Sequence, residues 1–194
     1  MRKRLYLVRH GATDYNDLGV YFGKTDCSLN GEGVRQGKSL GYSLSDIHFD
    51  EIFTSPMKRC VDTARFISTE MKPIVLDELK ELDFGVWEGL NYKQCMELYP
   101  EVFTEWSSNL KNTAPPEGEH YLDFYERIRE FYKSKLSGKE GSILIVAHKG
   151  VLQMLASILL AGDDSLFWNI NFQLGKYSIV DKDNDHATLN RLNV

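Results

Sequence analysis

Residues 5–13 read LYLVRHGAT. The apolar run over residues 5–8 is typical of a short buried strand, and it places Arg9 and His10 directly past the strand's carboxyl end. Ligands of open α/β sheets bind at that edge. The Arg9 guanidinium offers a planar fork of donors for phosphate oxygens, and the His10 ring offers a nitrogen that can act as nucleophile, acid or base. This stretch therefore predicts a site for covalent phosphoryl transfer.

The length and composition of the chain are typical of one globular domain. Its 194 residues are 42% hydrophobic and 26% charged, which is enough for one substantial core and short for two domains. The formal net charge is −5, so no global basic field favours nucleic acid or an anionic membrane as partner. We therefore expect a local cluster of arginines to hold an anionic substrate.

The apolar segments predict a cytoplasmic protein without a membrane span. Only residues 5–8 form an apolar run before Arg9, which is too short for the core of a signal peptide. The longest apolar stretch, residues 151–161, contains Gln153 and Ser157 and falls short of a membrane-spanning helix.

The cysteines predict neither a disulfide framework nor a zinc site. Cys27, Cys60 and Cys95 are odd in number and widely spaced, and they form no C-x-x-C pair. We expect three ordinary reduced thiols.

Strand and helix patterns alternate along the chain. Apolar runs predict strands over residues 5–8, 49–54, 73–76, 142–147, 173–181 and 188–192. Helical spacing predicts helices over residues 31–44, 57–71, 92–99, 101–106, 121–136 and 151–160. Asn30 is expected to cap the first helix, segments 79–89 and 109–119 to form loops, and residues 183–185 to turn between the last two strands. The alternation predicts an α/β fold: a single three-layer α/β/α domain over residues 1–194, with a mostly parallel mixed sheet and helices on both faces.

Arg59 and His148 also follow predicted strands. Arg59 lies on the first turn of the helix after residues 49–54, and His148 ends the strand over residues 142–147. Alone, Arg59 is typical of a solvated helix arginine and His148 of a buried core histidine. Because the carboxyl ends of parallel strands meet at one edge, we expect both side chains to converge on His10.

A histidine nucleophile also needs an acid that protonates the leaving alcohol. The segment over residues 79–89 contains Glu81, Asp83 and Glu88 among aromatic residues, where a carboxyl group can be desolvated and suited to proton donation. The pattern alone does not choose among the three.

Together these blocks resemble the histidine phosphatase superfamily, also called the phosphoglycerate mutase-like family. The resemblance covers nearly the whole chain in the family's order. Its matching segments are residues 7–13 with Asn16, 22–26, 29–33, 54–59 with Thr63 and Ala64, 81–89, 116–119 and 146–148. The ordered set is specific, whereas a lone Arg-His-Gly is weak.

The resemblance implies a metal-independent phosphatase with no cofactor and with a small helical cap, roughly residues 82–121, over the active site. It implies that His10 is the phosphorylated nucleophile and that Glu81 is the proton donor. It also implies that Arg9, Arg59 and His148 bind the phosphoryl group, that Asn16 assists there, and that Gly23 belongs to the substrate-side loop.

Two positions depart from the family pattern. Ala12 stands where many members have glutamate, which removes a negative charge near His10. Lys149 stands where glycine is common, and we expect its side chain to point to solvent.

Within the family, the short segment over residues 91–114 resembles the phosphatase branch, because the mutases carry a long insertion there. The segments 147–152 and 166–168 are most similar to alpha-ribazole phosphatases, which implies alpha-ribazole 5′-phosphate as the small-molecule substrate. Broad-specificity, phosphoserine and sugar phosphatases remain alternatives, and a phosphoglycerate mutase is a weaker one. The oligomeric state, a homodimer included, is left open.

The aromatic residues of the cap segment have two interpretations. They form either an apolar wall for a ring-bearing substrate or the packing of the cap onto the domain; they are Tyr92, Tyr99, Phe103, Trp106 and Tyr121. A catalytically silent phosphate-binding module is disfavoured because His10 and Glu81 are both present.

Overall fold

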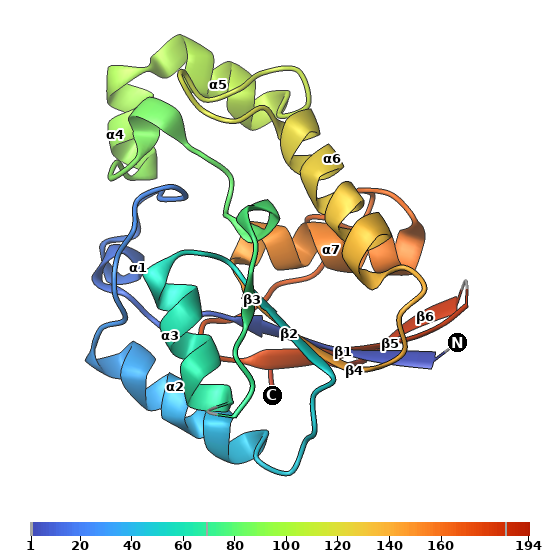
Figure 1. The fold of residues 1–194 in the computed structure, drawn as a ribbon. Helices are drawn as coiled ribbons and strands as arrows, with labels where there is room; N and C mark the ends of the chain where they lie inside the picture. The colour runs from blue at the N-terminus through green and yellow to red at the C-terminus, as the bar shows by residue number, and fades with distance from the viewer. Residues whose placement is uncertain (1, 69, 185) are drawn as a thin grey trace.

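The computed structural model describes residues 2–68, 70–184 and 186–194 (Figure 1). Within these residues, one six-stranded sheet has the strand order β3-β2-β4-β1-β5-β6. The strands are β1 (Arg2–Arg9), β2 (Glu51–Thr54), β3 (Ile74–Val75), β4 (Gly141–Ala147), β5 (Tyr177–Asp183) and β6 (His186–Arg191). The helices are α1 (Asp14–Leu18), α2 (Gly31–Ser43), α3 (Lys58–Ile67), α4 (Tyr92–Leu98), α5 (Pro100–Ser108), α6 (Tyr121–Phe131) and α7 (Lys149–Ala161).

The sheet is mixed and mostly parallel, as predicted. Strand β4 pairs in parallel with β1 and β2, and β2 pairs in parallel with β3. Strand β5 runs antiparallel to both β1 and β6. The carboxyl ends of β1, β4 and β2 therefore meet at one edge of the sheet.

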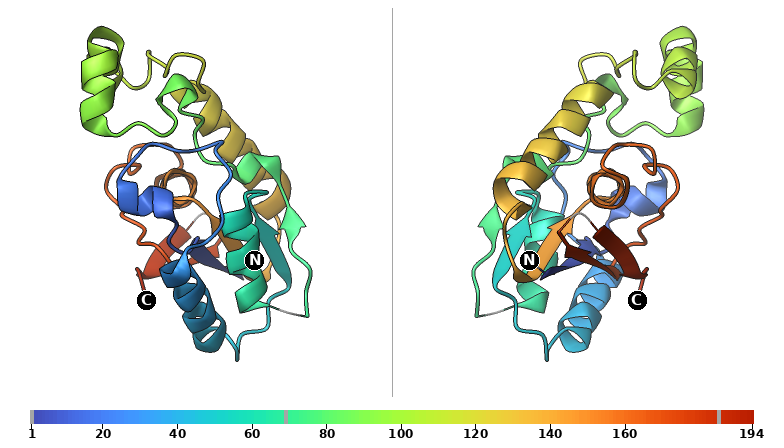
Figure 2. Two further views of the ribbon diagram at one scale, coloured as in Figure 1. Left: turned by 90° about the vertical axis from the view of Figure 1, so that its left-hand side faces the viewer. Right: turned by 90° about the vertical axis from the view of Figure 1, so that its right-hand side faces the viewer.

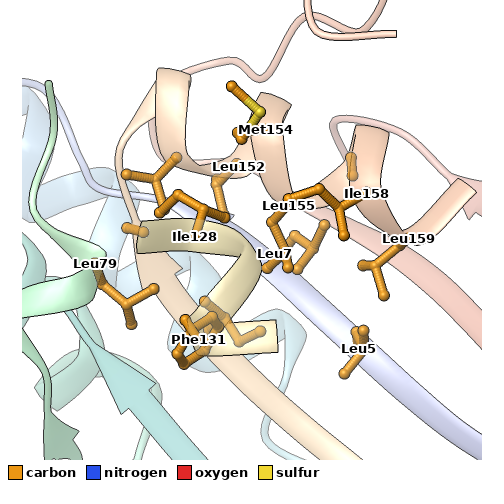
Figure 3. Packing of buried hydrophobic residues seen from close by; sticks show 14 of the residues in the cluster. Leu5, Leu7, Leu79, Ile128, Phe131, Leu152, Met154, Leu155, Ile158 and Leu159 are labelled. Carbon is orange, nitrogen blue, oxygen red and sulfur yellow. The ribbon is translucent and has the colours of Figure 1, made fainter. Parts of the chain in front are cut away.

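Helices cover both faces, which confirms the three-layer prediction. Successive side chains of a strand point to opposite faces. Leu5 and Leu7 of β1 accordingly pack in one core with α6 and α7, whereas Tyr6 and Val8 pack in another with α2 and α3. Figure 3 shows Leu5 and Leu7 beneath side chains of α7, with residues of α6 beside them.

Residues 82–121, here called the cap, form a small helical unit. Figure 2 shows α4 and α5 at one end of the molecule, away from the sheet. Their own core contains Trp87, Cys95 and Phe103, each fully buried. Helix α4 ends before Pro100 and α5 begins on it, because proline fits the first helical position and interrupts a helix interior.

Two boundaries differ from the sequence prediction by four residues each. The helix expected over residues 57–71 ends at Ile67, because Ser68 adopts an extended conformation. The strand expected over residues 173–181 begins at Tyr177, because Gly175 turns instead to donate its N–H to the carbonyl oxygens of Arg9 and His10.

Other segments carry more helical structure than expected. Helix α1 was not predicted. Short 3-10 turns occupy Asp77–Leu79, between the strand expected over residues 73–76 and the loop expected over residues 79–89, and Gly85–Trp87 inside that loop. The helix expected over residues 121–136 is α6 followed by a π-helical turn over Tyr132–Leu136.

The turn expected over residues 183–185 is described only in part. Asn184 has the left-handed φ of 50° that suits a tight turn, and Asp185 lies outside the described residues. No helix among residues 2–68, 70–184 and 186–194 has both the length and the apolar character that crossing a membrane requires.

Candidate active site

The register of β1 against β4 brings two histidines together. Arg9 pairs with Ala147 across these parallel strands, so the residues that follow, His10 and His148, leave the sheet side by side. Their ring centroids lie 5.2 Å apart, and both side chains are buried. The structure thus places the two sequence-predicted histidines at one point.

The hydrogen bonds of His10 identify the nitrogen that is free to react. Its Nδ1 lies 2.7 Å from the carbonyl oxygen of Gly11. Because a carbonyl oxygen only accepts, a neutral His10 ring carries its proton on Nδ1. Nε2 then keeps its lone pair, as a nucleophile requires.

The environment keeps both rings neutral. Burial, and then the positive charges of Arg59 and Arg9, hold the pKa of His10 well below its ordinary value. Burial and the charge of Arg59 also lower the pKa of His148. A neutral imidazole is the nucleophilic form, so the cationic pocket favours reactive His10 in the free protein.

We expect the free energy of unfolding to fall as the pH drops below about 6.5, the ordinary pKa of histidine. Below that pH the unfolded chain binds protons at His10 and His148, whereas the folded protein, with both pKa values lowered, does not. This stability is present above about pH 6.5 and is lost as the pH falls toward the folded-state values, at up to about 1.4 kcal/mol per pH unit for each residue. Chemical denaturation at stepped pH measures the slope.

The variant His10→Asn should lower this slope, because one of the two linked protons is removed. The matched variant His48→Asn changes an exposed histidine and should leave the slope as it is. An equal slope in the wild type and in His10→Asn would contradict the linkage.

Arg59 is fully buried and is fixed by the loop that precedes α2. Its Nη1 donates to the carbonyl oxygen of Thr25 at 2.8 Å and its Nη2 to that of Gly23 at 3.0 Å. Its Nε donates to Nδ1 of His148 at 3.3 Å. That bond leaves the proton of a neutral His148 on Nε2, which donates to Oγ of Ser55 at 2.8 Å. The second arginine and the second histidine are therefore held as one unit.

Arg9 has a buried donor without a partner. Its Nη1 donates to the carbonyl oxygen of Phe172 at 2.9 Å. Its Nε is buried and has no hydrogen-bond partner among the described residues. An unpaired buried donor costs about 1–3 kcal/mol, and an oxygen of a phosphate group would satisfy it.

Glu81 sits at the amino end of α7. Its Oε2 accepts from the backbone N–H of Gly150 at 3.0 Å, and its Oε1 accepts from that of Leu82 at 3.1 Å. A Cβ at position 150 would lie 2.6 Å from Oε1 of Glu81. The close approach of the carboxylate to α7 therefore requires glycine at this position.

Glu88 and Asp83, the other two candidates for the acid, accept hydrogen bonds from backbone N–H groups instead. Glu88 accepts hydrogen bonds from the backbone N–H groups of Gly23, Lys24 and Thr25. Asp83 accepts from the N–H of Gly85 at 2.8 Å and pairs with Lys24. Neither carboxylate lines the cavity at His10, whereas Glu81 does.

Asn16 and Gly23 have different places in the site. Oδ1 of Asn16 accepts from the backbone and the hydroxyl of Thr13, which caps α1. The amide nitrogen is then the atom that Asn16 offers to the cavity. Gly23 does not line that cavity, and its carbonyl oxygen instead accepts from Arg59.

A cavity of about 360 Å³ unites these groups. It is lined by Arg9, His10, Asn16, Gly19, Val20, Tyr21, Phe22, Arg59, Glu81, Phe84, His148 and Lys149. A nucleophilic ring nitrogen, two arginines and a carboxyl group therefore face one space, although the net charge of the chain is negative.

A second cavity, of about 230 Å³, adjoins the first. Tyr21, Glu81, Phe84 and Lys149 line both. The rest of its wall is mainly apolar and includes Leu82, Trp106, Leu110, Tyr121, Phe124, Phe167 and Trp168. Trp106 and Tyr121 therefore line a cavity, in keeping with the first of the two interpretations. Phe103 is buried in the core of the cap and Tyr99 packs against it, in keeping with the second.

Some cavity residues were given no role in the site from the sequence. Tyr21 carries no motif beyond its aromatic character, and Phe84 lies in the matching segment 81–89 without a role of its own. Trp168 is 72% exposed and follows α7 in an apolar triplet, which is a weak signal of a binding surface. Lys149 is exposed as expected, yet it also lines both cavities.

Comparison with known proteins agrees with this geometry. The sequence profile of the Histidine phosphatase superfamily (branch 1) matches residues 5–194. The chain belongs to this superfamily. It is a phosphatase, and five of the segments that carried the resemblance, residues 7–13, 22–26, 54–59, 81–89 and 146–148, contribute side chains to the cavity at His10.

The relatives of this histidine phosphatase are named for different substrates. An Adenosylcobalamin/alpha-ribazole phosphatase of Escherichia coli (strain K12) is 31% identical over 194 residues, covering 98% of this chain and 95% of the relative. Phosphoserine phosphatase 1 of Hydrogenobacter thermophilus is 30% identical, covering 98% of this chain and 92% of the relative. The crystal structure of the alpha-ribazole phosphatase from Shigella flexneri superimposes with a TM-score of 0.90 at 31% identity, covering 98% of this chain and 96% of that one.

The described part of this histidine phosphatase contains no cluster of three or more histidine, cysteine, aspartate or glutamate side chains suited to a metal ion. The positive charge in the cavity at His10 comes from side chains, chiefly those of Arg9 and Arg59.

Proposed function

We propose that the protein hydrolyses alpha-ribazole 5′-phosphate in the assembly of the cobalamin nucleotide loop, through a phosphohistidine intermediate on His10. The observation that carries this proposal is the apolar cavity beside the catalytic cavity. The substrate joins a phosphate to a ribose that bears a bicyclic aromatic base. The phosphate suits the arginine-lined space, and the base suits the aromatic one. The alpha-ribazole phosphatases of Escherichia coli and Shigella flexneri, at 31% identity, support the same substrate.

Glu81 lies where the proposed reaction needs an acid. It lines both cavities, so it borders the phosphate on one side and the leaving alcohol on the other. In the first step, Nε2 of His10 forms a bond to phosphorus while the bond from phosphorus to the ribose oxygen breaks. Glu81 gives its proton to that oxygen. Arg9, Arg59 and His148 hold and neutralise the phosphoryl oxygens, and the amide of Asn16 assists them.

The second step returns the enzyme to its starting state. The Glu81 carboxylate takes a proton from water as the water oxygen attacks phosphorus. The bond between phosphorus and Nε2 breaks, phosphate leaves, and the His10 ring recovers its lone pair. Positioning and charge stabilisation supply most of the rate, as in phosphoryl transfer generally.

Phosphate release from a panel of phosphomonoesters tests the substrate. The panel holds alpha-ribazole 5′-phosphate, phosphoserine, 3-phosphoglycerate and p-nitrophenyl phosphate, without added metal. We expect the highest kcat/KM for alpha-ribazole 5′-phosphate. Similar low values for all four would favour a broad-specificity phosphatase, and mutase products from 3-phosphoglycerate would overturn hydrolysis as the main activity.

Phosphoserine is the second candidate substrate, because Lys149 lies at the junction of the two cavities. An ammonium group there can pair with the carboxylate of phosphoserine. The phosphoserine phosphatase of Hydrogenobacter thermophilus, at 30% identity, is in keeping with this alternative. A preference for phosphoserine that Lys149→Met abolishes would establish it.

We expect Trp168→Ala to raise KM for alpha-ribazole 5′-phosphate by about 3- to 10-fold, or about 0.7–1.4 kcal/mol, because an aromatic contact with the base is lost. Trp168 is on the rim of the apolar cavity and is 72% exposed, so the fold should not suffer. The rate with phosphoserine, which has no ring, should change little. Tyr42→Ala removes an exposed aromatic side chain of α2 and serves as the matched control. Equal losses for both substrates would argue against a base-binding cavity.

A further inference from the structure

Arg127 of α6 and Glu119, which lies just before that helix, form a two-point ion pair. Nε of Arg127 donates to Oε1 of Glu119 at 2.9 Å, and Nη2 donates to Oε2 at 2.7 Å. The two side chains are only 21% and 19% exposed. The planar guanidinium matches the carboxylate in both contacts, so the fork is fixed in direction as well as in position.

The remaining nitrogen of Arg127 binds the backbone that leads into Glu81. Nη1 donates to the carbonyl oxygen of Glu78 at 2.7 Å and to that of Lys80 at 2.8 Å. Lys80 directly precedes Glu81 in the chain. Helix α6 thereby holds the segment on the amino side of the proposed acid.

Glu119 binds the same segment on the other side. Its backbone N–H donates to the carbonyl oxygen of Asp83 at 2.9 Å. Hydrogen bonds therefore fix the backbone at Lys80 and at Asp83, and Glu81 lies between these two residues.

The position of the Glu81 carboxyl group depends on the backbone of residues 80–83. One of its two oxygens accepts from the N–H of Leu82, which lies inside this segment, and the other accepts from Gly150 on α7. A shift of the segment would move the carboxyl group relative to both cavities. Proton transfer requires the donor within hydrogen-bond distance of the leaving oxygen, and a misplacement of about 1 Å can cost about 100-fold.

We propose that the Arg127–Glu119 pair is a clamp that positions Glu81 for proton transfer to the leaving group. Arg127 is thus a positioning residue, and its role rests on the proposed function of Glu81 as the acid. An ion pair with no such role would contribute only a modest amount to stability, about 0–1 kcal/mol where it is exposed. The clamp instead has a kinetic consequence that depends on the substrate.

The experiment compares Arg127→Met, Arg127→Lys and Glu81→Gln on two substrates. p-Nitrophenolate leaves without protonation, whereas an alkyl alkoxide requires it. We expect Arg127→Met to lower kcat/KM, which reports the steps up to phosphoryl transfer to His10, by about 10- to 100-fold for an alkyl phosphate and by no more than about 3-fold for p-nitrophenyl phosphate. Arg127→Lys keeps the charge but not the fork, and it should show the same substrate pattern to a smaller degree.

Two further variants separate positioning from stability. In the double variant with Glu81→Gln, the change Arg127→Met should have little additional effect on the alkyl phosphate, because the acid is already gone. Arg4 lies on β1, five residues before Arg9, and forms a similar two-point pair with Asp181. Arg4→Met breaks that pair and should lower kcat/KM for neither substrate. An equal loss with both substrates, or additive losses in the double variant, would overturn the clamp.

The proposed acid and the clamp fail in different ways. If Glu81→Gln itself lowers kcat/KM equally for both substrates, the acid assignment is overturned, and the clamp with it. If Glu81→Gln affects the alkyl phosphate selectively while Arg127→Met does not, only the clamp is overturned.

Discussion

Replacing His10 with alanine is expected to lower kcat by about 10⁴- to 10⁶-fold, because the ring nitrogen on which we propose the covalent intermediate forms is removed. The remaining pocket still holds Arg9 and Arg59, so phosphate esters should continue to bind. His10 borders a cavity, and among the described residues its side chain hydrogen-bonds to the carbonyl oxygen of the neighbouring Gly11. The far-ultraviolet circular dichroism spectrum should therefore match that of the wild type. Initial rates with p-nitrophenyl phosphate measure the loss.

The variant His48→Ala is the control for this loss, since it changes an exposed histidine away from the cavity. Turnover by a folded His10→Ala protein within about 10-fold of the wild type would exclude His10 as the nucleophile.

Replacing Glu81 with glutamine is expected to lower kcat for an alkyl phosphate such as alpha-ribazole 5′-phosphate by about 10²- to 10⁴-fold, the usual contribution of a general acid. Glutamine keeps the size of the side chain, and its oxygen can still accept from Gly150. With p-nitrophenyl phosphate the first step should proceed, because that leaving group needs no proton. Hydrolysis of the intermediate should slow, because the base that activates water is gone. A burst of p-nitrophenolate followed by a slow steady rate is the expected time course.

Glu88→Gln is the comparison for this experiment. Glu88 was a competing candidate for the acid, and it binds the backbone of residues 23–25 instead. Its loss should displace Arg59 through the Gly23 and Thr25 carbonyl groups and lower the rates with both substrates alike. The same leaving-group dependence in Glu88→Gln as in Glu81→Gln would contradict the assignment of roles.

The meeting of His10, Arg59 and His148 could be predicted from the sequence. Each follows a strand pattern closely, and parallel pairing aligns the carboxyl ends of such strands. In the structure, Arg9 pairs with Ala147 and Thr54 pairs with Val146, so the carboxyl ends of β1, β4 and β2 are aligned as that rule predicts. The three-layer fold was predictable for a related reason, since strands and helices alternate along the chain.

The choice among Glu81, Asp83 and Glu88 could not be made from residue types. All three are carboxylates in one loop, and they differ only in which donors surround them. Glu88 faces the N–H groups of residues 23–25, more than 60 positions away in the chain. Contacts at such a separation leave no local pattern in the sequence. Here the family resemblance selected Glu81, which is the one of the three that lines the cavity at His10.

The roles of the cap aromatics were undecided for a similar reason. Phe103 and Trp106 are three residues apart on α5, so they lie on neighbouring parts of one helix face. Phe103 nevertheless fills the core of the cap, whereas Trp106 also reaches the apolar cavity. Short elements were missed because they depend on single side chains: α1 has five residues and is fixed by the capping box of Thr13 and Asn16.

The most direct test of phosphoryl transfer through His10 is peptide mass spectrometry of Glu81→Gln, mixed with p-nitrophenyl phosphate and quenched in alkaline denaturant, where phosphohistidine survives. The expected result is one added phosphoryl group on the peptide that carries His10, formed in step with the burst of p-nitrophenolate. Release of p-nitrophenolate with no phosphoryl group on His10, or with that group on another residue, would contradict the mechanism.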